Sequence, residues 1–507
     1  MRNNGKNFSL KTRTMAMIFA LPAMALGLTL LSSPPAKSTE PASEPAAADV
    51  TSPLNSLEEK IWNLLDNDKA VYVTLPEADF RALGDGFDLP DGGRTVTELA
   101  MKSPGGAFDP RDVAKIKPEV LGYKADWIVE RYKRYNLDWD IAGLRLTSLN
   151  PDAKNYPWII IMNGGAANVY EFFVDLKNRP GWGQYLAQKL NVMIITIPGN
   201  FKYGGWDEPI QSIQRQPQYL LDRDLPMEES EVRNALLTNA VVLQGVKALI
   251  MKHTQGDLLM IGHSTSGEIS MLANDDPDLR ARLKGRYMGW GSGGPARMDN
   301  VRMTKEGRGG AGFDAGAVPA PARKQIPLEI LSRRDVASYS HGYSGFLNPL
   351  YEPGMSHAQI AERWLNVEGR RRANFKQQIQ DLEHGGDIDQ KGRVEVEIEN
   401  LLQKHGNPWG VNLEDVSKDL FITHYTRMDG YNKMVWTVAH FDRNHWVPEE
   451  PMKAVEVFYA TEYRAKNPKA KIRLIVWDPP MTHYGHVELP RQLAAADYSV
   501  VRWLMKE

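Results

Sequence analysis

The chain has no cysteine among its 507 residues. This absence excludes thiol catalysis and thiolate metal ligands, and an exported chain of this composition must be held by its core rather than by disulfides. The chain also lacks an excess of either charge, because 61 basic and 63 acidic residues leave a formal net charge of -2. Nucleic acids and anionic lipids attract broad basic surfaces, so the composition predicts neither as a partner.

The N-terminal residues have the layout of an export signal. Basic residues precede an apolar stretch from Met15 to Leu31, which predicts a cleaved signal peptide over residues 1–33. A retained anchor is the alternative, because the run approaches membrane-spanning length. Residues 34–53 are rich in Pro and Ala and are predicted to form a disordered spacer. We expect a periplasmic or extracellular protein with no stable membrane insertion once the signal is removed.

A short segment between a predicted strand and a predicted helix indicates a catalytic serine. The apolar run Leu258 to Ile261 leads into Gly262-His263-Ser264-Thr265-Ser266-Gly267, and helix-compatible residues follow. In a nucleophile elbow of the GxSxG type, a strand bends sharply into a helix and presents the serine above the sheet. The corner therefore predicts Ser264 as a nucleophile. Ser266 stands at the usual glycine and Gly267 comes one place late, which predicts a helix slightly farther from the strand.

Several apolar segments without alternation predict strands buried on both faces of a mostly parallel sheet. A helical stretch over residues 231–252 precedes the serine corner, so the order of elements indicates a doubly wound α/β fold. The predicted strands are Leu144–Leu149, Trp158–Met162, Val192–Ile197, Leu258–Ile261, Tyr287–Trp290, Met434–Val438 and Ile472–Val476.

The predicted domain organisation has one core in two parts, residues 141–295 and 419–507. Residues 54–140 are predicted to form an N-terminal helical cap, with helical patterning at Leu57–Leu65 and Trp127–Tyr135. Residues 296–418 change in character and predict a large, largely helical insertion that covers the site as a lid. A helical decoration without a catalytic role is the alternative.

With these strands and corner, the chain resembles the α/β-hydrolase superfamily over about residues 140–300 and 420–507. The resemblance implies that nucleophile, acid and histidine follow in that order along the chain. Asp442, in the turn after the Met434–Val438 strand, is the expected acid, with Asp478 and Asp429 in reserve. A turn aspartate that caps its own backbone is the alternative. In the loop after the last strand, His486 follows Gly485 and is the expected base, with His483 in reserve.

The resemblance also implies two backbone donors for an oxyanion. One is expected at Gly165 or Ala166, in the glycine-rich turn after Trp158–Met162, and the other at Thr265. The implied activity is hydrolysis of a carboxylic ester, lactone or related acyl bond in a small-molecule or polymer substrate, with no cofactor and no metal. Amide cleavage is the nearest alternative.

Two other functions compete with the serine hydrolase. Histidines and a carboxylate gather near the C-terminus, which suits a metal-dependent hydrolase, although no HExxH or HxHxDH pattern is present. The residues concerned are His440, Asp442, His445, His483 and His486. A non-catalytic ligand-binding protein on the same fold is the second alternative.

Overall fold

A computed structural model of the chain describes residues 53–67, 72–90, 96, 110–162, 170–173, 180–196, 225–237, 239–263, 266–290, 398–420, 430–439, 467–479, 481 and 485–506. All of them belong to one unit, residues 48–507. The predicted signal peptide and nearly all of the spacer lie outside these ranges. Among the helices in these ranges, none is long and apolar enough to cross a lipid bilayer.

Nine strands form one sheet in the order β1-β9-β8-β7-β6-β4-β5-β3-β2. Neighbouring strands run parallel except where β3 meets β2 and β5. The prediction of a mostly parallel sheet is therefore confirmed. The strands are β1 (Tyr72–Leu75), β2 (Tyr123–Arg134), β3 (Leu137–Ser148), β4 (Trp158–Met162), β5 (Val192–Thr196), β6 (Leu258–His263), β7 (Arg286–Trp290), β8 (Lys433–Ala439) and β9 (Lys471–Trp477).

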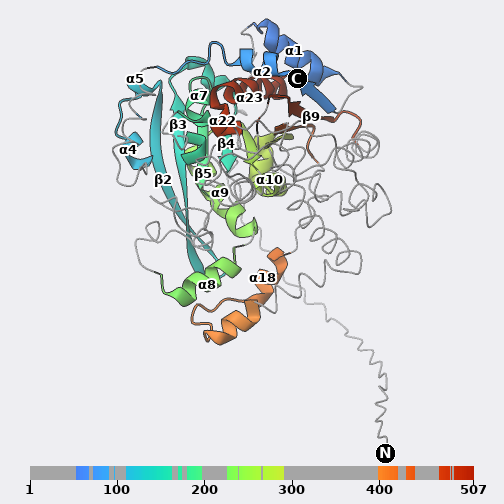
Figure 1. Ribbon diagram of the computed structural model, residues 1–507. Helices are drawn as coiled ribbons and strands as arrows, with labels where there is room; N and C mark the ends of the chain where they lie inside the picture. Colours follow the sequence, from blue (N-terminus) through green and yellow to red (C-terminus); the bar gives the residue numbers. More distant parts are fainter. Residues whose placement is uncertain are drawn as a thin grey trace, which may run out of the picture. The chain divides into compact units, whose positions relative to one another are not determined.

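Successive residues of the central strands face two different helical layers. In β4, Ile159 and Ile161 join one buried apolar cluster, whereas Ile160 and Met162 join the other. This division explains why the strands show no polar alternation, since both faces of the sheet are covered. Figure 1 shows helices on both sides of the sheet.

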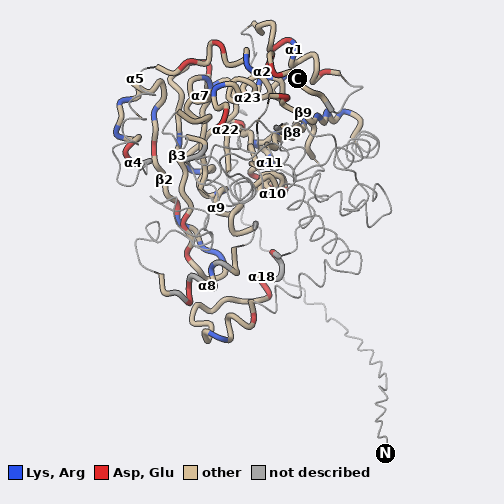
Figure 2. Tube along the Cα trace, viewed as in Figure 1, with Lys and Arg blue, Asp and Glu red and all other residues tan. Residues whose placement is uncertain are grey.

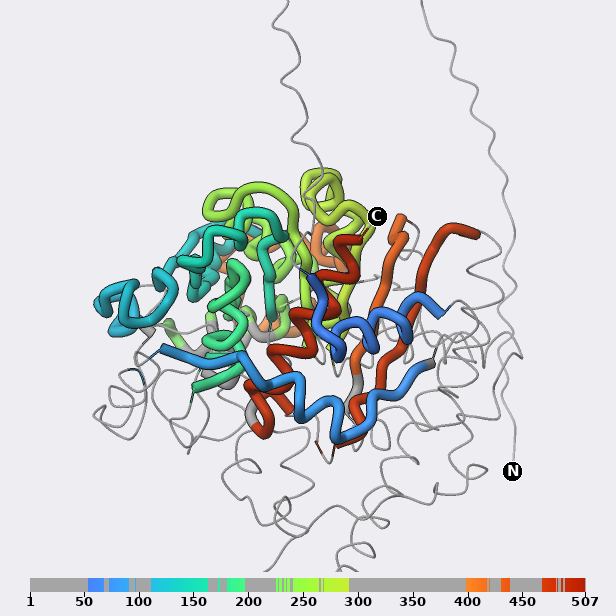
Figure 3. The backbone as a smooth tube through the Cα atoms, turned by 90° about the horizontal axis from the view of Figure 1, so that it is seen from above, coloured from blue at the N-terminus to red at the C-terminus, as the bar shows by residue number. Residues whose placement is uncertain are grey.

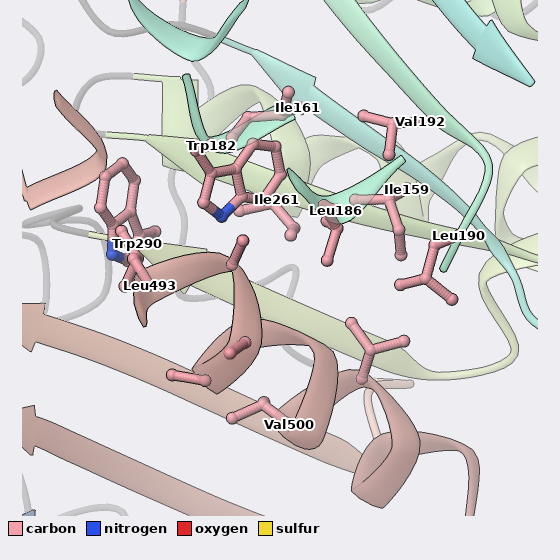
Figure 4. Close-up of a cluster of buried hydrophobic side chains, with 14 of the residues drawn as sticks. Ile159, Ile161, Trp182, Leu186, Leu190, Val192, Ile261, Trp290, Leu493 and Val500 are labelled. Atoms are coloured by element: carbon pink, nitrogen blue, oxygen red, sulfur yellow. The ribbon is translucent and has the colours of Figure 1, made fainter. Parts of the chain in front are cut away.

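The first layer consists of helices from both ends of the chain and from the middle. They are α1 (Ser56–Asp66), α2 (Glu77–Leu83), α7 (Trp182–Leu186) and α23 (Pro490–Met505). Seen from above, α23 lies beside α1 and α2 (Figure 3). Figure 4 shows Trp182 of α7 beside Ile261 of β6, and Leu493 of α23 beside Trp290, all members of one buried cluster. The opposite layer holds α9 (Asn239–His253), α10 (Ser266–Leu272) and α11 (Pro277–Leu283).

The N-terminal segment corrects one prediction. Residues Trp127–Tyr135, predicted to be helical, lie almost entirely in strand β2, and both β1 and β2 belong to the sheet rather than to a separate cap. In this segment α1 and α2, together with the short turns α4 (Pro110–Val113) and α5 (Pro118–Leu121), are helical as expected. The predicted 231–252 helix is two helices, α8 (Met227–Ala235) and α9.

The β2–β3 hairpin projects beyond the carboxyl end of β5. Ala142 of β3 is paired with Thr196, the last residue of β5, so the part of β3 before Ala142 runs past that end. Here α8 packs on the hairpin: Arg233 donates a hydrogen bond of 2.7 Å to the carbonyl of Asp138 and lies over Trp139. Charged residues of both signs gather along this projection (Figure 2).

Only the last part of the predicted lid lies within the described ranges, as helical residues 398–404 and α18 (Leu413–Leu420). Val416 of α18 shares a buried cluster with Tyr135 of the hairpin turn. Asp419 accepts hydrogen bonds from Arg134 and from the Tyr135 hydroxyl. The C-terminal end of the insertion is thus attached at the edge of the sheet where the parallel strands end (Figure 1).

A buried acid in α23 predicts a pH-dependent stability. Burial raises the pKa of Asp497 to about 8 from 3.8, although Trp182 donates a hydrogen bond of 2.7 Å to its carboxyl group. Because the folded-state pKa exceeds the unfolded one, the stabilisation from this group is complete below about pH 4 and is lost as the pH rises toward 8.

The substitution Asp497→Asn keeps the shape of the side chain and removes its ability to carry a negative charge. Its stability advantage over the wild type is therefore expected to grow between pH 5 and pH 8, by up to about 1.4 kcal/mol per pH unit. Urea unfolding of both proteins across this range measures the difference. Asp152→Asn makes the same substitution at an exposed position and is the matched control. Parallel wild-type and Asp497→Asn curves would contradict the protonated buried acid.

Candidate active site

The serine corner lies at the carboxyl end of β6, near the middle of the sheet, where α10 begins three residues after His263. A Cβ atom on Gly262 would lie 2.4 Å from the Cα atom of Gly267 and 2.7 Å from its nitrogen. Strand and helix therefore approach so closely that no side chain fits at Gly262. The expectation of a helix held farther away is wrong, because Gly267 supplies the close contact in place of residue 266.

Ser266, the first residue of α10, is fully buried. Its hydroxyl oxygen lies 2.7 Å from the carbonyl oxygen of Met162 and 2.7 Å from that of His263. A hydroxyl that donates to backbone carbonyls inside the protein is poorly placed to attack a substrate. This geometry favours the register in which Ser264, rather than Ser266, is the nucleophile. Ser264 and Thr265 themselves lie outside the described residues.

Of the three residues expected to form the triad, Ser264, Asp442 and His486, the structure describes His486. It lies in the short helix α22 (Gly485–Glu488), between β9 and α23, and it is fully buried. Its ring stacks on that of Phe172 with centroids 4.5 Å apart and an interplanar angle of 20°. The ring centroid lies 4.9 Å from that of His263 and 4.7 Å from that of Trp290. The imidazole is therefore enclosed by aromatic rings at the serine corner.

Strand register explains part of this cluster. His263 ends β6, Trp290 ends β7, and the two residues are paired across the parallel strands, with ring centroids 4.8 Å apart. The third ring, Phe172, comes from α6 (Tyr170–Phe173), which packs against α22. Sequence reasoning missed all three as neighbours of His486. The position of Trp290 could have been predicted, because it ends the predicted strand that follows the serine segment in the chain.

The other predicted site residues are not brought together in the described part of the chain. Asp478 directly follows β9, three strands from β6, and its backbone N–H donates a hydrogen bond of 3.0 Å to the carbonyl of Leu75. Within the described ranges, no group of three or more potential metal ligands occurs. The predictions that fall outside these ranges concern Gly165, Ala166, Asp429, His440, Asp442, His445 and His483.

Three observations together identify the architecture. Parallel strands flank the serine strand β6 on both sides, a glycine-lined corner joins β6 to α10, and a histidine from the segment after the last strand lies at that corner. A mostly parallel sheet whose central strand ends in so close a contact with the following helix is the arrangement of the α/β hydrolases. The chain has the α/β-hydrolase fold.

Comparisons with known proteins find solved structures of low sequence identity and low TM-score. No family model matches the sequence, and no curated protein is significantly similar to it. Among solved structures, esterase E22 is 12% identical, with 75% of this chain and 100% of that one covered and a TM-score of 0.36. The enol-lactonase from Burkholderia xenovorans LB400 is 12% identical, with 72% and 97% covered and a TM-score of 0.33. Identities this low concern the fold alone, so activity has to be inferred from the site.

Proposed function

We propose that this α/β-hydrolase-fold protein is a serine hydrolase that cleaves a carboxylic ester, lactone or related acyl bond. The proposed triad is Ser264, His486 and Asp442, and the proposed oxyanion donors are the backbone N–H groups of Thr265 and of Gly165 or Ala166. One observation carries the proposal: the His486 ring contacts His263, the residue directly before Ser264, although it comes from the far C-terminal part of the chain.

The chemistry requires an imidazole beside the Ser264 hydroxyl. Ser264 Oγ attacks the acyl carbon while His486 takes the hydroxyl proton, and the carbonyl electrons move onto the oxygen held by the backbone donors. His486 then returns the proton to the departing alcohol, which leaves an acyl-enzyme. A water molecule, deprotonated by the same imidazole, releases the acid and restores the serine. Asp442 orients His486 and stabilises its charged form.

Burial of His486 supports this role. The ring stacks on Phe172 and is flanked by Trp290, so its orientation is fixed by packing on two sides. Aromatic faces attract cations, which favours the imidazolium that forms during each acyl transfer. A surrounding that excludes water also strengthens the hydrogen bonds to the oxyanion.

A burst experiment tests the proposal. With p-nitrophenyl esters of increasing acyl length, we expect a rapid release of about one nitrophenolate per active protein, followed by slower turnover, because an acyl-enzyme accumulates. The same activity should be lost on treatment with a fluorophosphonate and should survive a metal chelator. Activity that the chelator abolishes and the fluorophosphonate spares would contradict the proposal and favour a metal-dependent hydrolase.

A further inference from the structure

Ser266 replaces the glycine that usually follows the elbow serine at this spacing. A second feature accompanies this replacement. Gly262 makes its close contact with Gly267, which lies one residue after position 266. Position 266 is therefore relieved of the requirement for glycine. Its side chain is nevertheless fully buried, and burying a hydroxyl without a hydrogen bond costs free energy. The hydrogen bonds that it makes are the informative feature.

The hydroxyl connects two strand ends. Met162 is the last residue of β4 and His263 the last of β6, and the Ser266 oxygen lies 2.7 Å from the carbonyl oxygen of each. These two strands are direct neighbours, with Met162 paired to Gly262. The single hydroxyl proton is donated to one carbonyl or shared between both. When the proton is donated to Met162, or shared between the two carbonyls, the hydroxyl fixes the start of α10 to the end of β4.

The two segments joined in this way are those that hold the proposed oxyanion donors. Gly165 and Ala166 follow Met162 in the sequence, and Thr265 directly precedes Ser266. Donors to an oxyanion act only at a defined separation, with each N–H about 2.7–3.1 Å from the developing charge. A bond that fixes the Met162 carbonyl relative to α10 restricts how far the two donor segments move apart.

We propose that Ser266 is a positioning residue that holds the two halves of the oxyanion site in register through its hydrogen bond to Met162. The inference rests on the proposed function, since it concerns the same acyl transfer. Ser266 is fully buried and its hydroxyl lies against backbone carbonyls, so it would act through its neighbours. Its loss should therefore weaken stabilisation of the transition state and leave the pocket that binds the ground state intact.

Ser266→Ala removes the hydroxyl and keeps the Cβ atom, and Ser266→Gly restores the common elbow pattern without the hydrogen bond. For both we expect kcat with a p-nitrophenyl ester to fall by roughly 10- to 100-fold, with little change in KM, because a small displacement of donors costs that much. Ser266→Thr, which retains a hydroxyl, should recover part of the loss if it folds. Thermal unfolding reports whether each variant is folded.

A thiono ester has sulfur in place of the carbonyl oxygen. The ratio of the rates with the oxygen ester and the thiono ester reports on the oxyanion donors, and a purely structural role of Ser266 would leave this ratio unchanged. Sulfur is larger and a weaker acceptor, so well-placed donors favour the oxygen ester. The ratio of the two rates should fall in Ser266→Ala and Ser266→Gly. The matched control is Ser270→Ala, on the same helix, because the buried Ser270 hydroxyl donates only to the Ser266 carbonyl, at 3.2 Å.

The outcomes separate this inference from the function on which it rests. Reduced kcat and a reduced oxygen-to-sulfur ratio in both Ser266 variants, with both values unchanged in Ser270→Ala, are the expected result. An active wild type whose Ser266→Ala variant keeps its kcat and its ratio would overturn the positioning role alone. Equal losses in the Ser266 and Ser270 variants would also overturn it. A wild type that neither hydrolyses esters nor reacts with a fluorophosphonate would overturn the proposed function as well.

Discussion

Ser264→Ala is expected to lower the turnover of an ester substrate by about 10⁴-fold or more, because the variant lacks the oxygen that forms the acyl-enzyme. The residual rate reflects binding and the oxyanion donors alone. KM should change little, since the hydroxyl contributes more to the transition state than to the bound substrate. Steady-state kinetics of the purified variant, with the nitrophenolate burst as a second readout, measure the effect.

Ser270→Ala is the natural comparison for this change. It removes another buried serine hydroxyl a few residues farther along the chain, within α10, and should retain its activity. If Ser264→Ala keeps more than about a tenth of the wild-type kcat, another residue carries the nucleophilic attack, since a triad does not tolerate loss of its nucleophile at that level.

Replacing His486 should have the second-largest effect. His486→Gln fills much of the space between Phe172 and Trp290 but has no group that accepts the serine proton, so we expect kcat to fall by about 10³-fold or more. His486→Ala leaves a cavity of the shape of an imidazole beside these rings. Added imidazole should partly restore the activity of this variant, and a rescue of this kind separates the loss of a base from a packing defect.

The matched control is His253→Gln. His253 is a partly buried histidine at the end of α9, 2.6 Å from a carboxyl oxygen of Glu130. Its loss removes an imidazole from a different surface of the protein and should leave kcat unchanged. Full activity in His486→Gln would assign the base to another histidine, and His483 is the first to test.

The buried strands could be predicted from the sequence because the fold leaves them no polar face. Trp158–Met162 coincides with β4, and Tyr287–Trp290 differs from β7 by one residue. Such runs lie between two helical layers, so the apolar character is continuous and ends where the strand ends. The same logic placed the serine corner at the end of β6, and with it the fold class.

The β2–β3 hairpin was missed for a local reason. A two-residue turn with positive φ at both positions is usually read from Asn-Gly or a similar pair. Here the pair is Tyr135-Asn136, with φ values of 51° and 62°. Tyrosine gives no turn signal, so the residues before it were assigned to a helix. Only the pairing of β2 with β3 along their whole length shows the segment to be a strand.

Part of the candidate site could likewise be predicted from the sequence, and part of it depends on packing. His486 was predictable because a glycine and the last strand precede it, and this order is a property of the sequence. Its contacts with Phe172 and Trp290 depend on how α6 and the end of β7 pack, which no local pattern encodes. Ser266 was interpreted as a departure from the motif, whereas the structure gives it a buried hydrogen bond and transfers the glycine's role to Gly267.

The most direct test of the central claim is to locate the serine that reacts. The wild-type protein is treated with a fluorophosphonate, digested and analysed by fragmentation mass spectrometry, which resolves Ser264 from Ser266 and Ser270 within one peptide. The account predicts one phosphonylated residue, Ser264, and a reaction that is much slower in His486→Gln. Modification of any other residue, or labelling that proceeds at the same rate without His486, would contradict it.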